Sequence, residues 1–159
     1  MAIYMKLGSA VGDVTEAGHK NWIEVLSVNW STSRRVRSAV GVGKNRESTS
    51  AYVSEILVEK LIDSASSNIA QGAFVGQEEP CIIDFTRVDK GQEAILRKVV
   101  LMDAIISSLT TRGTKDDRPT ETLTLNFTHI TITDIAESAA GTNADTSTVI
   151  YDLQLAQTG

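Results

Sequence analysis

Residue types that perform chemistry are few in this chain, and their spacing does not suit a metal site. His19 and His129 stand far apart in the sequence, and Cys81 is the single cysteine. A zinc centre needs three or four ligands, which one cysteine and two scattered histidines do not supply. Cys81 precedes Ile82 and Ile83, so we expect a buried thiol, whose pKa is raised by apolar surroundings and whose reactivity is therefore low.

A glycine-containing stretch is similar to part of a phosphate-binding loop. In Gly41-Val42-Gly43-Lys44 the last glycine and the lysine have the right order, but Ser38 stands where the loop needs its first glycine. Asn45 stands where the loop needs serine or threonine, and no strand-to-helix pattern surrounds the segment. The stretch therefore predicts no nucleotide site.

Two groups of residues are candidates for acid–base catalysis. Asp116 and Asp117 are neighbouring carboxylates, but they lie between Lys115 and Arg118 in a stretch typical of a solvated loop. His129 with a nearby acid is a possible general base, although a hydrogen-bonded histidine within a strand is the commoner situation. The sequence thus predicts no catalytic residue and no cofactor, and an enzyme centred on His129 stays as one alternative.

The composition is that of an ordinary globular protein. Of 159 residues, 42% are hydrophobic and 22% are charged, and this length fits one domain over residues 1–159. A net charge of −5 and an aromatic content of 5% argue against nucleic-acid binding, which uses basic surfaces with aromatic platforms. The longest apolar runs, such as residues 99–102, are too short to cross a bilayer, so we expect no membrane insertion.

The first eight residues lack a basic segment followed by an apolar one, so we expect no cleaved signal peptide. Assembly in the cytoplasm is then the expectation, and any export needs another route. The single cysteine agrees with a reducing compartment.

Alternation of apolar and polar residues predicts that most of the chain forms β-strands. The clearest case is Ile83 and Phe85, which alternate with Asp84 and Thr86. The turn signal Asp89-Lys90-Gly91 makes this strand and the next a hairpin. Besides this strand at residues 81–86, strands are expected at residues 3–7, 22–30, 52–61, 93–110, 120–135 and 148–155.

The strand at residues 120–135 changes phase along its length. Leu123 and Leu125 occupy one face, whereas Ile130 and Ile132 fall on positions of the other parity. A period of two cannot change phase without an extra residue or a change of neighbours. We therefore expect a bulge or strong bend near residue 129, as occurs where a sheet curls.

One helix is expected at residues 63–75. Ala65, Ile69 and Ala73 form a narrow apolar stripe, and Gly76 stands where a helix-terminating glycine belongs. A stripe of small residues indicates a helix that lies against a sheet.

A long segment at residues 34–50 carries five basic residues and one acid, while the rest of the chain is correspondingly acidic. A loop of this length inside a compact domain is usually functional or disordered. A basic arm on an acidic body suits head-to-tail docking between copies, and a solvated loop is the alternative. The candidate residues for this contact are Arg34, Arg35, Val36, Arg37, Ser38, Gly41, Val42 and Gly43.

About seven strands with one helix leave exposed sheet edges unless the sheet closes or pairs with another chain. Residues 93–110 and 120–135 are longer than the usual strand of about 5–6 residues. Residues 95–106 are partly apolar on both faces, which predicts burial on both sides, with part of that burial between copies. We expect a mainly β fold: an antiparallel β-barrel or two curled sheets with one flanking α-helix and a long extended loop.

Several segments, in order and at characteristic spacing, carry a family resemblance. The most specific is Thr120-Glu121-Thr122-Leu123-Thr124-Leu125-Asn126-Phe127, and the others are residues 1–8, 23–30, 41–44, 58–64 and 67–69. Together they resemble the haemolysin-coregulated proteins (Hcp) of bacterial type VI secretion systems, whose matching stretch reads Thr-Glu-x-Val/Leu-Thr-Leu-Asn-Phe. The likeness covers essentially the whole chain, although the segment at residues 34–50 is richer in arginine than in some relatives.

The resemblance implies a β-barrel with a helix on its side, six copies in a ring, and rings stacked into a hollow tube. In the family the sheets line the bore and the helices lie outside. The implied partners are other copies of the chain, a tip spike protein, a contractile sheath, and effector proteins carried in the lumen into target cells. A bore must be polar to release its cargo, and the lumen candidates are Asn29, Ser31 and Thr114.

Two further alternatives stay open. A phage-tail-tube-like structural protein would share the same architecture. A closed barrel that holds a small ligand in its mouth belongs to another class of protein, and it predicts a monomer with an apolar cavity.

Overall fold

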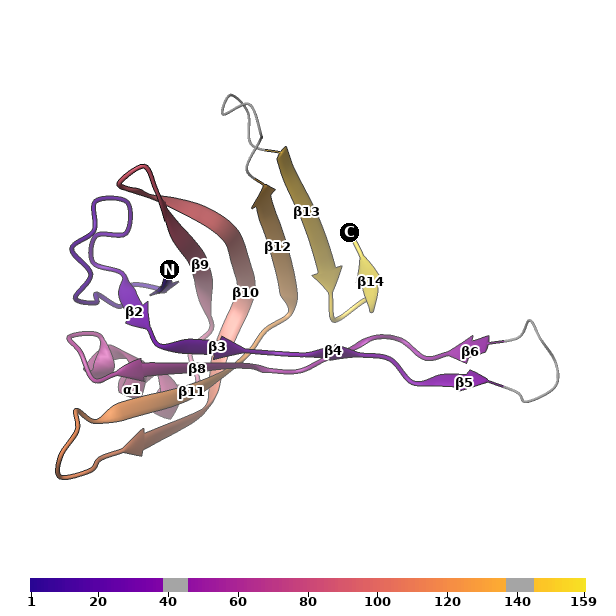
Figure 1. Cartoon of the computed structure of the whole chain (residues 1–159). Coiled ribbons are helices and arrows are strands. Elements are labelled where there is room, and N and C mark those ends of the chain that lie inside the picture. The colour runs from indigo at the N-terminus through magenta and orange to yellow at the C-terminus, as the bar shows by residue number, and fades with distance from the viewer. Residues whose placement is uncertain (39–45, 137–144) are drawn as a thin grey trace.

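The computed structural model describes residues 1–38, 46–136 and 145–159, and it shows curled antiparallel sheets with an arm projecting from one end (Figure 1). The expected mainly β fold with one flanking helix is confirmed. In the described residues the elements are β1 (Ala2–Leu7), β2 (Ile23–Val25), β3 (Ser27–Asn29), β4 (Thr32–Ser33), β5 (Val36–Ser38), β6 (Arg46–Ser48), β7 (Tyr52–Val53), β8 (Ile56–Leu61), α1 (Ser66–Val75), β9 (Glu79–Asp89), β10 (Gln92–Arg112), β11 (Thr120–Asn126), β12 (His129–Ala136), β13 (Asp145–Asp152) and β14 (Gln157–Thr158).

The longest strand, β10, belongs to two sheets. Its first half pairs with β9 and β12, and its second half pairs with β11. The first sheet continues through β9 to β1 and β2, and through β12 to β13 and β14. The second sheet continues through β11 to β8 and β3. The great length expected near residues 93–110 is therefore explained by one strand that serves both sheets.

The corner between the two sheets lies at Asp103, where φ is 51°. Opposite this corner the chain leaves β11 and enters β12. The Thr128 N–H donates to the Met102 carbonyl at 3.1 Å, and Thr128 Oγ1 donates to Asp103 Oδ2 at 2.9 Å. The bend expected near residue 129 is confirmed, because the ladder changes sheet between Asn126 and His129.

Inward-facing apolar residues of both sheets form one core. In β8, for example, alternate residues are buried and the residues between them are at least partly exposed. Burial of such side chains is the main favourable contribution to folding. The largest fully buried apolar residues include Met5, Ile23, Ile56, Val58, Ile69, Ile83, Val99, Leu101, Leu123 and Leu125.

Two of the predicted strands are interrupted. Residues 22–30 form β2 and β3, which separate at Leu26, whose N–H donates to the Glu59 carbonyl at 2.8 Å. β2 pairs with β1 whereas β3 pairs with β8, so the chain passes from one sheet to the other at Leu26. Residues 52–61 are likewise divided into β7 and β8. An alternation of apolar and polar residues does not show that the two halves of a predicted strand pair with different strands.

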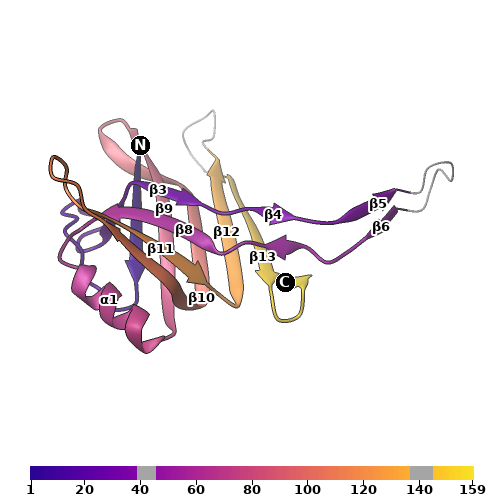
Figure 2. The same cartoon turned by 90° about the horizontal axis from the view of Figure 1, so that it is seen from below.

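The described parts of the segment expected as a loop at residues 34–50, which are residues 34–38 and 46–50, belong to a two-stranded arm. β3 pairs with β8, β4 with β7 and β5 with β6, and these pairs follow one another away from the body (Figures 1 and 2). Eight residues separate Asn29 from Arg37, and at roughly 3.3 Å per residue they span about 26 Å. Sequence alternation missed these strands because a ribbon with two solvated faces needs no apolar period.

Two glycines expected at chain reversals adopt positive φ. Gly91, with φ of 80°, completes the turn between β9 and β10, which confirms the predicted hairpin. Gly76, with φ of 71°, ends α1, and its N–H donates to the Gly72 carbonyl at 2.9 Å. Glycine takes this backbone conformation without the strain that a side chain would add.

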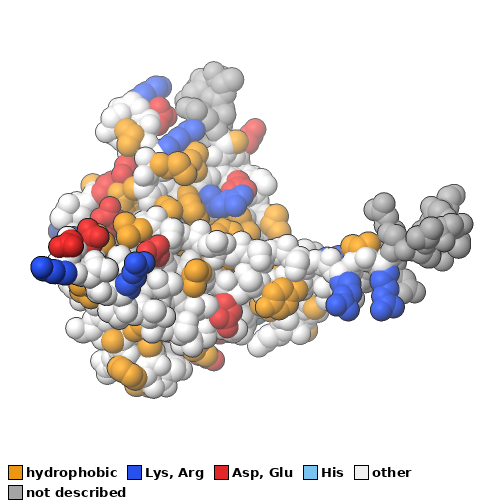
Figure 3. All heavy atoms as spheres, turned by 60° about the horizontal axis from the view of Figure 1, so that its bottom comes forward, with side chains coloured by type: hydrophobic (Ala, Val, Ile, Leu, Met, Phe, Trp, Pro, Cys, Tyr) orange, Lys and Arg blue, Asp and Glu red, His pale blue; other side chains and the backbone are white. Residues whose placement is uncertain are grey.

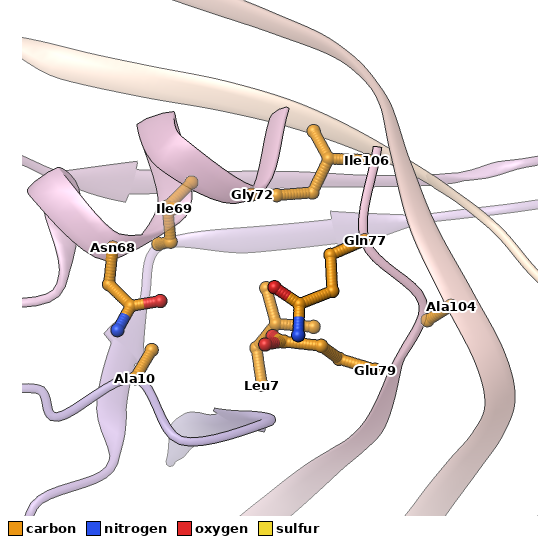
Figure 4. Close-up of a pocket in the computed structure, with 9 residues that line it drawn as sticks. All are labelled: Leu7, Ala10, Asn68, Ile69, Gly72, Gln77, Glu79, Ala104 and Ile106. Carbon is orange, nitrogen blue, oxygen red and sulfur yellow. The ribbon is translucent and has the colours of Figure 1, made fainter. Parts of the chain in front are cut away.

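The helix α1 packs against β10 through Ile69, which is buried. Figure 4 shows a small cavity between them, lined by Leu7, Ala10, Asn68, Ile69, Gly72, Gln77, Glu79, Ala104 and Ile106. No helix in the described part of the chain is long and apolar enough to cross a membrane.

Replacing Gly72 by alanine is expected to raise the free energy of unfolding by about 0.5–1 kcal/mol, because alanine loses less backbone entropy than glycine in a helix. The added Cβ would meet only Ile106 Cδ1, at 3.8 Å. Gly76→Ala is the matched control, and its positive φ should make it destabilising by about 1 kcal/mol. Urea unfolding at one protein concentration measures both, and a less stable Gly72→Ala variant would contradict the packing described.

Candidate assembly surfaces

The far end of the arm carries a group of basic side chains. Figure 3 shows Lys and Arg side chains there, next to the part of the chain that is not described. Of the predicted contact residues, Arg34, Arg35, Val36 and Arg37 are exposed on the ribbon, Ser38 ends β5, and Gly41, Val42 and Gly43 lie outside the described residues.

Backbone hydrogen bonds hold the two strands of the arm together. The Ser54 N–H donates to the Ser31 carbonyl at 2.9 Å, and the Thr49 N–H donates to the Arg35 carbonyl at 3.1 Å. The Ser31 N–H donates to Ser54 Oγ at 2.8 Å. An isolated two-stranded ribbon is marginally stable at best. The arm therefore depends on the body at its base and has no core of its own.

The outer face of the second sheet, formed by β10, β11, β8 and β3, is polar. Ser108 and Thr124 hydrogen bond across this face at 2.6 Å, and Ser27 Oγ donates to Glu59 Oε2 at 3.3 Å. By strand register the outward-facing residues include Ser27, Asn29, Leu57, Glu59, Ser108, Thr110, Thr122 and Thr124. Most of these side chains are polar, and the apolar Leu61 and Ile105 share their outward parity.

The helix lies on the other side of this sheet. Lys60 and Glu121 alternate with the outward-facing residues and point inward, where both are buried. Ser66, the first residue of α1, donates through Oγ to Glu121 Oε2 at 3.0 Å. The start of α1 is thus bound to the inner side of β11, and the polar outer face is left uncovered by the helix.

The same contacts satisfy a buried lysine. The Lys60 side chain is 0% exposed, and Nζ donates to Asp63 Oδ1 at 2.9 Å and to Glu121 Oε2 at 3.0 Å. It also donates to the Leu61 carbonyl at 2.8 Å. A buried ammonium is tolerated when its hydrogens have acceptors of this kind. Sequence reasoning missed this group, although Lys60 shares the inward parity of residues 56 and 58.

The three predicted lumen residues are all exposed, but they do not form one group. Asn29 lies on the polar outer face opposite Leu57, and Ser31 lies at the base of the arm. Thr114 lies in the turn between β10 and β11, next to the end of β8 at which Leu61 pairs with Thr120.

The margin of the first sheet is open along β13. β14 pairs with Tyr151 and Asp152 only, so residues 145–149 have a strand partner on one side within the described chain. Val149 is 56% exposed, and Leu155 after it is 65% exposed. An open edge with exposed apolar side chains is a surface to which another chain can pair.

A buried ionic triad centres on His19. Its Nδ1 lies 2.7 Å from Glu16 Oε2, and its Nε2 lies 3.0 Å from Asp84 Oδ2. The Gly18 backbone N–H, and then His19 itself, hold the pKa of Glu16 below its ordinary value. The triad binds residues 8–21 to the outer face of the first sheet.

The same cluster is the one place in the described chain where side chains gather as metal ligands do. Ligand atoms of Glu16, His19 and Glu93 lie within 4.8 Å of one another. Glu93 Oε1, however, accepts the Tyr4 hydroxyl at 2.8 Å, and Glu16 is bonded to His19. The geometry is that of a hydrogen-bonded network, whose protons a metal would have to displace. Sequence spacing gave no sign of it, because Glu93 and His19 are brought together only by the fold.

The remaining candidate chemical residues have structural contacts. His129 Nε2 lies 2.9 Å from Asp152 Oδ2. Although desolvation favours the protonated carboxyl, backbone N–H groups of Leu155 and Gln154 and the neighbouring His129 hold the pKa of Asp152 below its ordinary value. Burial raises the pKa of the Cys81 thiol to about 12.

Comparison with known proteins identifies the class to which this fold and these surfaces belong. The sequence profile of the family described as type VI secretion system effector, Hcp, matches residues 4–133, which is most of the chain. The chain therefore belongs to the Hcp family of type VI secretion systems, as the sequence resemblance indicated. Hcp proteins are secreted structural components of that system.

Solved structures share the fold. A type six secretion system protein matches with a TM-score of 0.90 at 23% identity, covering 99% of each chain. Hcp1 from Salmonella typhimurium matches with a TM-score of 0.78 at 23% identity, covering 99% of this chain and 98% of that one. A type VI secretion system effector from Yersinia pestis matches with a TM-score of 0.71 at 22% identity, covering 94% of this chain and 98% of that one. No curated protein matches the sequence.

Replacing His19 by glutamine is expected to lower the free energy of unfolding by about 1–3 kcal/mol, because buried Asp84 Oδ2 would lose the ring nitrogen that lies 3.0 Å from it. Asp84 is 2% exposed. Lys20→Gln, at the exposed neighbouring position, is the control and should change stability little. Urea unfolding compares the two variants, and equal losses would contradict the role given to the triad.

Stability should also fall in alkali through Tyr4. Burial, together with the Glu93 hydrogen bond, raises the pKa of Tyr4 from 10.0 to about 12. Folding therefore favours the neutral phenol, and this contribution is complete below pH 10 and lost as the pH rises through about 12. Tyr4→Phe should show a shallower decline over this window in urea unfolding at a series of pH values. Cys81 contributes to both proteins alike, so identical slopes would contradict the assignment.

Proposed function

We propose that the chain is a structural tube subunit of a type VI secretion system, with residues 1–159 acting as one domain. Six copies form a ring, and the rings stack into a hollow tube that is propelled into target cells and can carry effector proteins. The observation that carries this proposal is the arm. A ribbon with two solvated faces and no core gains stability only from another surface.

The ring closes through the open sheet margin. A head-to-side contact between identical subunits is a heterologous interface, and it closes into a ring when the rotation permits. β13 offers unpaired backbone groups over residues 145–149 and the exposed Val149 beside them. Pairing with a neighbour would satisfy those groups and bury the apolar side chain.

The bore is lined by the polar outer face of the second sheet. This face carries Thr122 and Thr124, and α1 lies on the opposite side of the sheet. A polar wall gives cargo few apolar contacts, so a protein inside can be released. Asn29 lies on this face, and Ser31 and Thr114 are proposed to line the bore near its two ends.

The arm forms the contact between stacked rings. This contact is a second heterologous interface, which does not close and so yields a filament. Arg34, Arg35, Val36, Arg37 and Ser38 supply this contact, with Gly41, Val42 and Gly43 beyond the described part of the chain. The tip spike protein and the contractile sheath are the further partners.

No catalysis is proposed. His19, His129 and Cys81 are held in buried or hydrogen-bonded contacts that serve the fold. Assembly takes place in the cytoplasm and is followed by secretion.

Native mass spectrometry of the purified protein is expected to show one closed species of six copies. Val149→Lys should dissociate it, because a charge would be buried at the ring margin. Val88→Lys, at the exposed hairpin end of β9, is the matched control and should leave the ring intact. A monomer at all micromolar concentrations in the unmodified protein would overturn the proposal.

Reversing the charge of Arg34, Arg35 and Arg37 to glutamate is expected to abolish stacking while single rings survive. The reason is that Arg35 and Arg37 lie farther along the arm than Ala51, the arm residue whose carbonyl accepts the Tyr151 hydroxyl of β13. Lys6→Glu, on β1, is the control. Negative-stain microscopy at low ionic strength counts stacked rings, and stacks as frequent as in the unmodified protein would refute the role of the arm.

A further inference from the structure

A cleft of about 90 Å³ lies where β2 joins β3 and β8 ends, away from the arm. Its walls come from three parts of the chain: residues 13–26, the junction of β8 with α1, and the turn before β11. The lining residues are Asp13, Glu24, Leu26, Leu61, Asp63 and Arg118.

The cleft and the arm occupy opposite ends of the same pair of strands. Leu26 directly precedes β3, and Leu61 ends β8. The other ends of β3 and β8 continue into the arm through β4 and β7. Figure 1 shows β2 and α1 at one end of the molecule and β5 and β6 at the other. A projection at one end and a hollow at the other allow identical copies to repeat head to tail.

Three carboxylates and one guanidinium line the cleft, so its lining is acidic on balance. Arg118 Nη2 donates to the Ile62 carbonyl at 2.9 Å. Asp63 is bonded to Lys60. Asp13 Oδ1 accepts the Ser64 hydroxyl at 2.5 Å. Glu24 is exposed and has no side-chain hydrogen bond to another described residue, so it is the carboxylate best placed to accept a new cation.

The apolar wall of the cleft suits an arginine in particular. Leu26 is 50% exposed and lies beside Leu61 in the lining. Arginine packs its methylene stem on apolar surface and directs a planar, weakly hydrated guanidinium to carboxylates. Lysine would match the charge but not the paired geometry that a carboxylate offers.

The arm presents arginines in a fitting arrangement. Arg37 lies in β5 and Arg35 directly precedes this strand, with its carbonyl accepting the Thr49 N–H of the opposite strand. Residues two apart on extended backbone project from the same face, so the two side chains share one face of the ribbon. Both are exposed, at the end of a projection that is about 26 Å long.

We propose that this cleft receives the Arg35–Arg37 face of the arm of a copy in the next ring, with Glu24 as the main acceptor. The inference rests on the proposed stacking of rings and names the receiving surface. One exposed ion pair contributes little, but a ring engages all its arms at once, and this multivalency gives a stable stack that weakens as salt rises.

Disulfide trapping tests the contact directly. Cys81 is fully buried, so new thiols are the reactive ones. Arg37→Cys protein is mixed with Glu24→Cys protein and oxidised. The expected product is a disulfide between the two variants, and Arg37→Cys mixed with Val88→Cys is the control that should give none. A dominant Arg37→Cys homodimer, or equal products in both mixtures, would overturn the proposal.

Charge exchange gives a second, independent readout by microscopy. Glu24→Arg should lose stacks, and adding Arg35→Glu and Arg37→Glu to the same chain should restore them. Native mass spectrometry of the same samples distinguishes failure of the cleft proposal from failure of the proposed function. Rings without the disulfide or the rescue would refute the cleft alone, whereas absence of rings in the unmodified protein would refute the proposed function as well.

Discussion

The structure depends on a single strand that belongs to two sheets. β10 turns its corner at Asp103, where the left-handed backbone conformation costs about 1–2 kcal/mol for a residue with a side chain. The hydrogen bonds from Thr128 to Asp103 and Met102 offset this cost and place the change from β11 to β12 at the same corner. β8 and β3 lie on one side of it, and the arm is their continuation. The direction of the arm is therefore set by a turn within β10.

Two buried ionic groups decide which surfaces stay open. His19 binds residues 8–21 to the outer face of the first sheet, and Lys60 with Asp63 and Glu121 binds the start of α1 to the inner side of the second. Burying charged groups is costly unless they have partners. Lys60 has three acceptors, whereas Asp84 has His19 at Oδ2 and no partner at Oδ1. What they leave uncovered is a polar face, a basic projection and an open apolar margin. These are the surfaces to which the proposed function assigns the contacts between copies.

Sequence patterns predicted the features that local spacing controls. The change in phase of the apolar alternation before Ile130 predicted the bend between β11 and β12, and Gly76 predicted the end of the helix. The corner at Asp103 was not predicted, because no residue pattern around Asp103 indicates a positive φ. The burial of Lys60 was not predicted, because a charged residue at an inward position interrupts the alternation of apolar and polar residues. The arm was expected only as an extended loop, because ribbons solvated on both faces lack apolar alternation. The acidic cleft could not be predicted, because it forms only when residues 13–26, 61–63 and 118 meet in the fold.

The most direct test of the account is an electron cryo-microscopy map of the assembled protein. The account predicts a ring with the threonines of β11 facing the bore, α1 on the outer wall, and each arm seated on the acidic end of a copy in the adjacent ring. A map with α1 turned toward the bore, or with arms that touch no neighbouring ring, would contradict it.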